Sequence, residues 1–319
     1  MNKKRYIGID LGGTKIAAGL VDDDGHILKK ITAPTLAHRA PEAIADDMAE
    51  LAKSLMKDFS LSPSEIEFLG VGTPGIANTS TGCVDFCSSL PFIRFPLVQI
   101  LKDKTGIGDV DIENDANAAA KAEHVAGAAK GYKDSVMITL GTGVGGGIII
   151  DNKIVTGCNF SAGELGHIVI EHNGRQCKCG RKGCWEAYSS ATGLIVTTKE
   201  KMLKNRDSVM WALCDNNIEK VSGRTSFNAM RAGDAAGREV VEEYIDYLTC
   251  GLVNIINIFQ PEVLSIGGGI SGEGDFLLDL INEPLAKFQY SARSDKRTKV
   301  VIAKLGNEAG IIGAAYLRK

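Results

Sequence analysis

One loop of the chain, residues 177–186, carries cysteines in a spacing that is typical of a metal site. Three thiols in the pattern C-x-C-x4-C and one upstream histidine are the ligand types of a tetrahedral Cys3His zinc site: Cys177, Cys179, Cys184 and His167. Gly180 and Gly183 allow the loop to turn tightly enough for the sulfurs to converge. Two alternatives stay open: a surface loop with incidental thiols, and His172 in place of His167 as the fourth ligand.

Two acids flank this metal loop without being needed as ligands. Glu164 lies in the segment Gly-Glu-Leu-Gly-His that ends at His167, and Glu186 follows Trp185 directly after the last cysteine. A carboxylate accepts hydrogen bonds, so each acid is able to hold hydroxyl groups of a ligand. Both could instead be ordinary surface acids, but their closeness to the metal loop favours a role in positioning a ligand.

Glycine-rich turns follow three of the predicted strands, and each offers backbone N–H groups to an anion. The turns contain Asp10, Gly12, Gly13, Thr14 and Lys15 in the first case, Gly141, Thr142 and Gly143 within residues 141–147 in the second, and Gly267, Gly268 and Gly269 in the third. Such turns hold phosphate oxygens, and an aspartate beside one binds the accompanying magnesium. Any one alone is more often structural, but three together predict nucleotide binding, with the third turn suited to the adenosine. The spacings match neither a P-loop nor a dinucleotide-binding motif.

Asp115 is the candidate catalytic base. It follows a predicted strand and begins a predicted helix, where the helix dipole favours an ionised carboxylate. The alternative is a helix-capping aspartate without a chemical role. Asn114 beside it offers both a donor and an acceptor, as a sugar hydroxyl requires.

The pattern of apolar residues predicts a chain in which strands and helices alternate. Strands are expected at residues 6–10, 16–21, 27–31, 68–71, 110–113, 135–140, 148–150, 263–266 and 300–304. Helices are expected at residues 41–59, from 115 to about 127, at 237–259 and at 309–317, with weaker helical signals between 187 and 234.

The order strand, glycine turn, strand, acidic turn occurs twice, first at residues 6–25 and again at residues 135–152. This repetition predicts a duplicated α/β fold. No proline- or serine-rich linker separates the halves, so we expect a hinge near residues 114–119. The predicted small domain comprises residues 1–117 and 300–319, and the predicted large domain, residues 118–299, carries the metal loop.

The composition indicates an ordinary globular protein, with 319 residues, 44% of them hydrophobic and 24% charged. A net charge of −3 without a basic block gives no reason to expect nucleic acid or an anionic membrane as a partner. We find neither a signal-peptide pattern nor an apolar run long enough to span a bilayer. Eight cysteines, three of them in metal spacing, fit a reducing cytoplasm better than a disulfide framework. Cys83 and Cys87 are interpreted as core or loop residues, with a redox pair as the alternative, and His124 as a surface or core packing residue.

Taken together, these motifs resemble the ROK family of sugar kinases, in the actin/hexokinase-like ATPase superfamily, and most of all its ATP-dependent glucokinases. The resemblance covers nearly the whole chain and is carried by Asp10–Lys15, Leu140–Gly147, Glu113–Ala120, Gly163–His167, Cys177–Glu186 and Ile266–Gly269. It implies a two-domain, ribonuclease H-like fold with a central cleft. It also implies a cytoplasmic enzyme that uses ATP with Mg²⁺, contains a structural Zn²⁺ and forms a homodimer.

The resemblance implies a role for each candidate residue in the phosphorylation of a hexose at its 6-hydroxyl. Asp115 takes the proton of that hydroxyl, and the turn at Gly75 closes over the sugar ring. The residues implied to hold the other hydroxyls are Asn114, Glu164, His167 and Glu186. His167 then serves twice, with one ring nitrogen on zinc and the other directed to the sugar.

One segment departs from the family pattern. Where many members carry Asn-Leu-x-Trp near the sugar pocket, this chain has Ser88-Ser89-Leu90-Pro91-Phe92. Glucose is the expected substrate, giving glucose 6-phosphate, and the alternatives are N-acetylmannosamine, mannose, fructose and allose. A sugar-responsive repressor would need a DNA-binding helix-turn-helix ahead of the first predicted strand, and only residues 1–5 precede that strand. A non-catalytic sugar sensor is less well supported, because the candidate base Asp115 is present.

Overall fold

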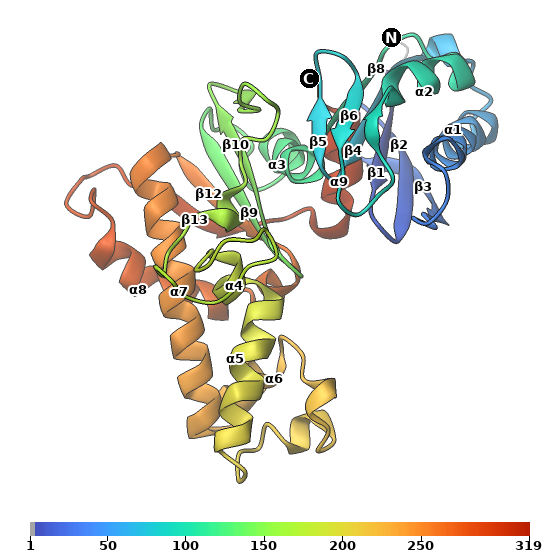
Figure 1. The fold of residues 1–319 in the computed structure, drawn as a ribbon. Coiled ribbons are helices and arrows are strands. Elements are labelled where there is room, and N and C mark those ends of the chain that lie inside the picture. Colours follow the sequence, from blue (N-terminus) through green and yellow to red (C-terminus); the bar gives the residue numbers. More distant parts are fainter. Residues whose placement is uncertain (1–3) are drawn as a thin grey trace. The chain divides into compact units, whose positions relative to one another are not determined.

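The computed structural model describes residues 4–319 (Figure 1). Contacts between residues divide the chain into two units. Unit 1 contains the described residues through Met137, together with residues 147–163 and 303–319, and unit 2 contains residues 138–146 and 164–302. The boundary predicted from the sequence, between residues 117 and 118, falls inside a helix of unit 1, and the hinge near residues 114–119 stays a prediction.

A five-stranded mixed sheet forms the centre of unit 1. Its strands are β1 (Arg5–Leu11), β2 (Lys15–Val21), β3 (Ile27–Pro34), β4 (Ile66–Thr73) and β8 (Val110–Asn114), in the order β3-β2-β1-β4-β8. The first three strands pair antiparallel, and β1, β4 and β8 pair parallel. All five strands were predicted from the sequence, within a few residues at each end.

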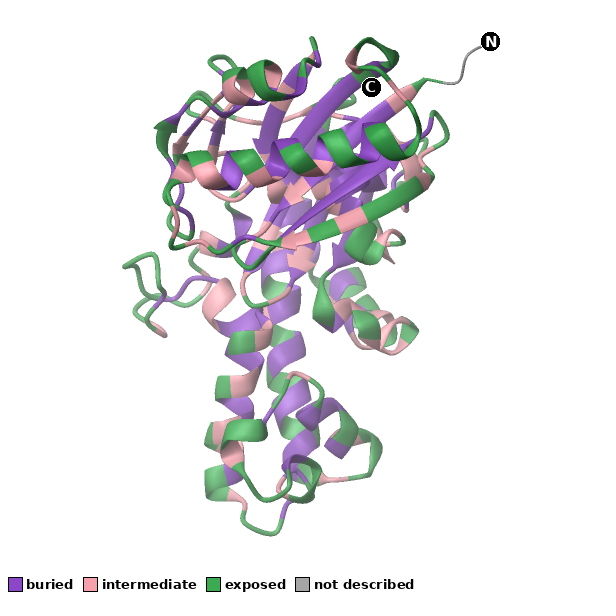
Figure 2. Cartoon of the chain, turned by 90° about the vertical axis from the view of Figure 1, so that its right-hand side faces the viewer, coloured by how far each residue is buried: buried purple, intermediate pink, exposed green. Residues whose placement is uncertain are grey.

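Helices cover both faces of this sheet. They are α1 (Pro41–Asp58) and α2 (Leu97–Thr105) on one face, and α3 (Asp115–Ala126) and α9 (Ala309–Ala315) on the other. Successive side chains of β1 point to opposite faces of the sheet and so contribute to the hydrophobic core on each face. Ile7 and Ile9 pack with α1 and α2, and Tyr6 packs with α3 and α9. Most residues of β1, β2, β4 and β8 are accordingly buried in Figure 2, whereas the edge strand β3 is exposed or half-buried and α1 presents one buried and one exposed side.

Unit 1 also contains a small antiparallel sheet that was not predicted. Its strands are β5 (Ile76–Asn78), β6 (Cys83–Phe86) and β7 (Ile93–Phe95), in the order β5-β6-β7. Strands of three or four residues have too few positions to show an alternating pattern, so periodicity alone does not reveal them. The segment that departs from the family pattern, residues 88–92, connects β6 to β7.

The second sheet repeats the strand order of the first. Its strands are β9 (Ser135–Leu140), β10 (Val144–Ile150), β11 (Lys153–Ile154), β12 (Val263–Gly267) and β13 (Lys299–Ile302), in the order β11-β10-β9-β12-β13. The predicted duplication is therefore confirmed. The second glycine turn was predicted too long, because β10 already begins at Val144 and only residues 141–143 form the turn.

The helices of unit 2 are α4 (Glu186–Ser189), α5 (Ala191–Lys204), α6 (Thr225–Arg231), α7 (Ala235–Phe259) and α8 (Asp275–Phe288). Short 3-10 helices occupy Pro63–Glu65, Leu165–His167, Ala212–Cys214, Ile218–Lys220, Gly269–Glu273 and Gly306–Glu308. The long helix α7, which runs beside α5, was predicted to within two residues (Figure 1). Within residues 4–319, no helix is both long and apolar enough to cross a membrane.

Candidate functional site

Asn114 caps the helix that begins with Asp115. Its Oδ1 accepts hydrogen bonds from the backbone N–H groups of Ala116 (2.9 Å) and Asn117 (3.3 Å), and its Nδ2 donates to the carbonyl of Gly75 (3.2 Å). The side chain thus ties the loop at Gly75 to the first turn of α3. Because both acceptor positions of Oδ1 are used, the group that Asn114 still offers to a ligand is the second N–H of Nδ2.

Asp115 is half-buried at the N-terminus of α3, and its Oδ1 accepts a hydrogen bond from the N–H of Ala116 (2.8 Å). Burial raises the pKa of Asp115, and the hydrogen bond from Ala116 opposes that rise. Burial also raises the pKa of Asp10, at the end of β1, and the negative charge of Asp115 adds to this effect, while Lys15 and Lys30 oppose it. The two carboxylates therefore share one desolvated region of unit 1.

Glu113 belongs to the same region, and its role was missed from the sequence. It is 5% exposed, and its Oε1 accepts from the backbone N–H of Asn114 (2.8 Å) and from Nδ2 of Asn117 (3.0 Å). Burial raises the pKa of Glu113, and these two donors oppose the rise. By accepting these two hydrogen bonds, the carboxylate of Glu113 fixes the backbone of Asn114 and the side chain of Asn117, and it therefore positions the first turn of α3.

The first glycine turn joins β1 to β2. The N–H of Gly12 donates to the carbonyl of Lys15 (2.9 Å), and the hydroxyl of Thr35 donates to the carbonyl of Gly12 (2.7 Å). Gly13, Thr14 and Lys15 are exposed, so their polar groups are accessible to a ligand.

The second glycine turn lies in unit 2 and contacts Glu186. Within the turn, the N–H of Gly141 donates to the carbonyl of Gly143 (3.0 Å). The N–H of Val144, the first residue of β10, donates to Oε2 of Glu186 (3.0 Å). The hydroxyl of Thr192 donates to the carbonyl of Thr142 (2.7 Å). Glu186 begins α4, so one carboxylate joins the second glycine turn to the end of the metal loop.

The third glycine turn follows β12, which ends at Gly267. Gly268 and Gly269 are exposed, and the hydroxyl of Ser271 donates to the carbonyl of Gly268 (2.7 Å). The turn leads directly into the 3-10 helix Gly269–Glu273.

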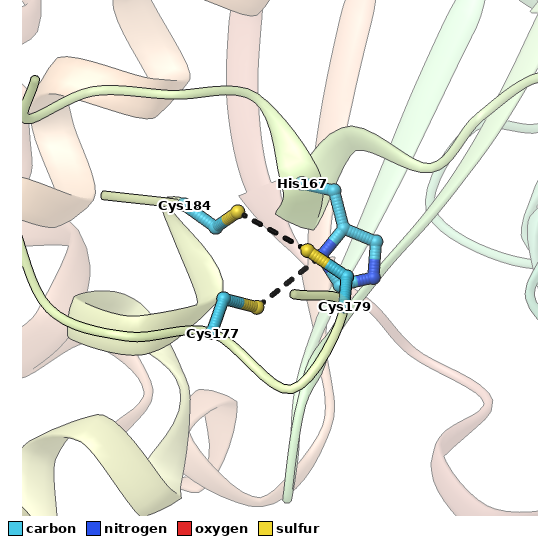
Figure 3. Close-up of side chains that lie close together, drawn as sticks. All are labelled: His167, Cys177, Cys179 and Cys184. Atoms are coloured by element: carbon cyan, nitrogen blue, oxygen red, sulfur yellow. Dashed lines mark hydrogen bonds between the residues drawn. The ribbon is translucent and has the colours of Figure 1, made fainter. Parts of the chain in front are cut away.

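The predicted metal ligands converge in unit 2 (Figure 3). One ligand atom from each residue lies within 4.8 Å of those of the other three: His167, Cys177, Cys179 and Cys184. Nδ1 of His167 lies 3.6 Å from Sγ of Cys177, and the sulfurs of Cys179 and Cys184 are also 3.6 Å apart. His172, the alternative fourth ligand, is an exposed residue outside this group.

The two ring nitrogens of His167 face different partners. Nδ1 is directed to the cysteines, and Nε2 lies 4.0 Å from Oε2 of Glu164, whose side chain is 63% exposed. Sγ of Cys177 also lies 3.8 Å from Oε1 of Glu186. Both acids that flank the metal loop are thus within reach of its ligands.

Three residues that received no chemical role, His124, Cys83 and Cys87, are buried or half-buried within the fold. His124 is buried, with Nδ1 3.1 Å from the hydroxyl of Ser135 and Nε2 3.1 Å from Oδ1 of Asn152. Cys87 is buried and Cys83 half-buried, and both are free thiols.

The candidate residues are divided between the two units. Unit 1 holds Asp10, Gly12, Gly13, Thr14, Lys15, Gly75, Asn114 and Asp115, and unit 2 holds Gly141, Thr142, Gly143, Glu164, His167, Cys177, Cys179, Cys184, Glu186, Gly267, Gly268 and Gly269. Within unit 1 the structure links Gly75 to Asn114 and brings Asp10 near Asp115. Within unit 2 it links Glu186 to the second glycine turn and to the metal loop.

Two sheets of equal strand order, each with a glycine turn after its first strand, define the class of the protein: the actin/hexokinase-like fold. The sequence profile of the ROK family matches residues 6–319, and the chain belongs to this family. The glucokinase of Streptomyces coelicolor is 37% identical over 317 residues, which span 98% of this chain and 97% of the relative.

Two further comparisons agree. The glucokinase of Thermotoga maritima is 37% identical over 321 residues, spanning 100% of this chain and 98% of the relative. The crystal structure of a ROK family glucokinase from Streptomyces griseus, in complex with glucose and AMPPNP, superimposes with a TM-score of 0.81 at 34% identity and covers 98% of both chains. The family predicted from the motifs is thereby confirmed.

Proposed function

We propose that this protein is an ATP-dependent hexose kinase that converts glucose to glucose 6-phosphate. The observation that carries the proposal is the full-length similarity to glucokinases at 37% identity, in a chain that keeps an ionisable, partly desolvated Asp115 at the start of α3. A non-catalytic regulator would have no need of that carboxylate.

Asp115 acts as the general base. Its raised pKa makes the carboxylate a better proton acceptor than an exposed aspartate. It takes the proton of the 6-hydroxyl as the hydroxyl oxygen forms its bond to the γ-phosphorus, and the bond from that phosphorus to the leaving oxygen of ADP breaks. Asn114, fixed by its bond to Gly75, donates its remaining N–H to the sugar.

The exposed residues of the first two glycine turns, Gly13, Thr14 and Thr142, offer backbone N–H groups to the phosphates of ATP, and the third turn, Gly267–Gly269, approaches the adenosine. Thr14 and Lys15 add a hydroxyl and a positive charge to the first turn. Asp10 holds the magnesium ion that accompanies ATP, directly or through water, and a bound cation would offset its raised pKa. Catalysis then rests on positioning and on electrostatic stabilisation of the transferred phosphoryl group.

The four ligand atoms of the metal loop fit a structural zinc ion. Zn–S bonds of about 2.3 Å and Zn–N bonds of about 2.0–2.1 Å in a tetrahedron require S···S and S···N distances of about 3.8 and 3.6 Å. The pair Cys177 Sγ and His167 Nδ1 and the pair Cys179 Sγ and Cys184 Sγ, each 3.6 Å apart, agree with that requirement, and the remaining pairs lie within 4.8 Å. With Nδ1 of His167 on the metal, Nε2 remains for the sugar beside Glu164, and Glu186 completes the predicted hydroxyl-binding set.

Residues 88–92, which correspond to a family segment near the sugar pocket, depart from the family pattern, so the preferred hexose has to be measured directly. The decisive experiment is a coupled assay of ADP formation over glucose, N-acetylmannosamine, mannose, fructose and allose. We expect the highest kcat/KM with glucose. A higher value for another hexose would reassign the substrate, and no turnover with any hexose would overturn the kinase assignment.

Two wider properties belong to the proposal as well. A cytoplasmic location is supported by the eight cysteines, which form no disulfide within the described residues, as a reducing compartment favours. A homodimer stays a prediction from the family resemblance.

A further inference from the structure

A cavity of about 800 Å³ opens in unit 1 on the side of α3 that the proposed chemistry does not use. It is lined by side chains of α3, of the loop after it and of the last described residues, among them Lys121, His124, Lys130, Lys133, Asn152 and Lys319. The volume lies in the range of pockets that hold small molecules.

The charge in the lining is predominantly positive. Four lysines face two aspartates, Asp23 and Asp24. Asp23 already accepts hydrogen bonds from Tyr6 and the N–H of Lys4, and it pairs with Lys319 at 3.6 Å. Lys130 is exposed and makes no ion pair within the described chain, so its charge is available to a ligand.

Lys121 is the unusual member of this lining. It is 5% exposed, and its Nζ makes one hydrogen bond within residues 4–319, to a main-chain oxygen of Lys319 (2.6 Å). Burial lowers the pKa of Lys121. An ammonium group carries three N–H donors, so two of them remain for a partner that enters the cavity.

His124 gives the cavity a rigid polar wall. Both of its ring nitrogens are engaged, with Ser135 and Asn152, so the ring is held in one orientation, and burial lowers its pKa. Such fixed groups are features of a pre-formed site rather than of a flexible surface.

We propose that this cavity binds a small phosphate monoester, held by the ammonium groups of Lys121 and Lys130. A compact dianion matches lysines, which recognise phosphate as point charges and do not require the planar geometry that arginine offers to carboxylates. Lys121 stands on the helix that begins with Asp115, so occupancy of the cavity bears on the element that carries the proposed base. The inference goes beyond the proposed function, because the cavity contains none of the residues assigned to the sugar or to ATP.

The test is an isothermal titration of the intact protein with inorganic phosphate and, separately, with glucose 6-phosphate, in the presence of saturating glucose and AMPPNP. We expect one saturable site for each probe. The Kd should rise about tenfold in Lys130→Met and more in Lys121→Met, because each variant loses a charge-assisted hydrogen bond to the phosphate. Lys57→Met, which removes an exposed lysine of α1, is the matched control and should leave the Kd unchanged.

Citrate provides the comparison of anion chemistry, and binding of citrate as tight as that of phosphate would overturn the preference for a phosphate. Equal Kd values in Lys130→Met and Lys57→Met would overturn the site itself, as would the absence of saturable phosphate binding. Lys130 is exposed, so its variant tests the site even where Lys121→Met fails to fold. The comparison among variants also holds if the protein proves not to bind glucose.

Discussion

The indole of Trp185 occupies the space above Gly251 on α7, and a Cβ built at Gly251 would lie 2.0 Å from Cε2 of Trp185. The ring is completely buried, and its Nε1 donates to the carbonyl of Tyr247 (3.0 Å). Trp185 separates the proposed ligand Cys184 from Glu186 in the sequence, and its backbone N–H donates to Ile168, next to His167 (2.9 Å). Packing of Trp185 into the notch, the space that Gly251 leaves on α7, therefore anchors the end of the metal loop without requiring a metal ion.

We expect Gly251→Ala to displace Trp185 and, through it, Glu186. Overpacking of this kind costs about 1–3 kcal/mol of unfolding free energy, although alanine is otherwise the better helix former. The KM for glucose should rise about tenfold or more while the zinc content stays unchanged, as measured by steady-state kinetics and metal analysis. Gly272→Ala, where a Cβ would meet nothing within 4 Å, is the control. A wild-type KM in Gly251→Ala would show that the anchor does not position Glu186.

Replacement of the proposed base tests the chemistry directly. Asp115→Asn keeps an acceptor for the N–H of Ala116 but cannot take a proton, so kcat should fall about 10²–10⁴-fold. Glucose binding, measured by calorimetry, should change little, since Asp115 is a base rather than the main ligand of the ring. In the wild type, kcat/KM should fall at acid pH with a midpoint above the ordinary aspartate pKa, because burial raises the pKa of Asp115. Substantial turnover in Asp115→Asn would remove the residue from this role.

The elements around Asp115 were predictable because their signals are local. The strand before it and the alanine-rich helix after it each follow from apolar residues within a few positions, and Asn114 is a good capping residue by type alone. Glu113 was not predictable, since an acid at the end of a strand gives no sign that Asn117 will turn back toward it.

In unit 2, the features that could not be predicted are contacts between residues far apart in the sequence. The four candidate metal ligands were proposed from a recognisable spacing, and the structure brings their ligand atoms close together. The bond from Val144 to Glu186 joins residues 42 positions apart, and the notch at Gly251 receives a tryptophan from another element. Such pairs depend on how elements pack, and the types of the residues alone do not reveal them. Helix α8 was missed as well, and it contains Pro284, a residue that ordinarily argues against a helix.

Asp10 and Asp115 should reduce stability at neutral pH. A carboxyl whose pKa is raised on folding binds its proton more tightly in the folded state, so the folded state loses stability as pH rises from the ordinary pKa through the raised one. We therefore expect Asp10→Asn and Asp115→Asn to raise the Tm at pH 7 by about 2–4 °C. The gain should shrink as the pH falls toward 4. Asp207→Asn, at an exposed position, should show no such trend in the same calorimetric series.

The zinc assignment makes a stoichiometric prediction. The wild type should hold about one zinc ion per chain, and Cys184→Ser should hold close to none, because serine is a poor zinc ligand and Cys184 is a buried member of the group. Metal loss should raise the KM for glucose more than it lowers kcat, since the ion orients His167 rather than acting on the phosphoryl group. Cys158→Ser, which changes an exposed thiol outside the group, is the matched control. Equal zinc content in the two variants, measured by mass spectrometry, would exclude Cys184 from the ligand set. A kcat loss without a change in KM would instead assign the ion a catalytic part.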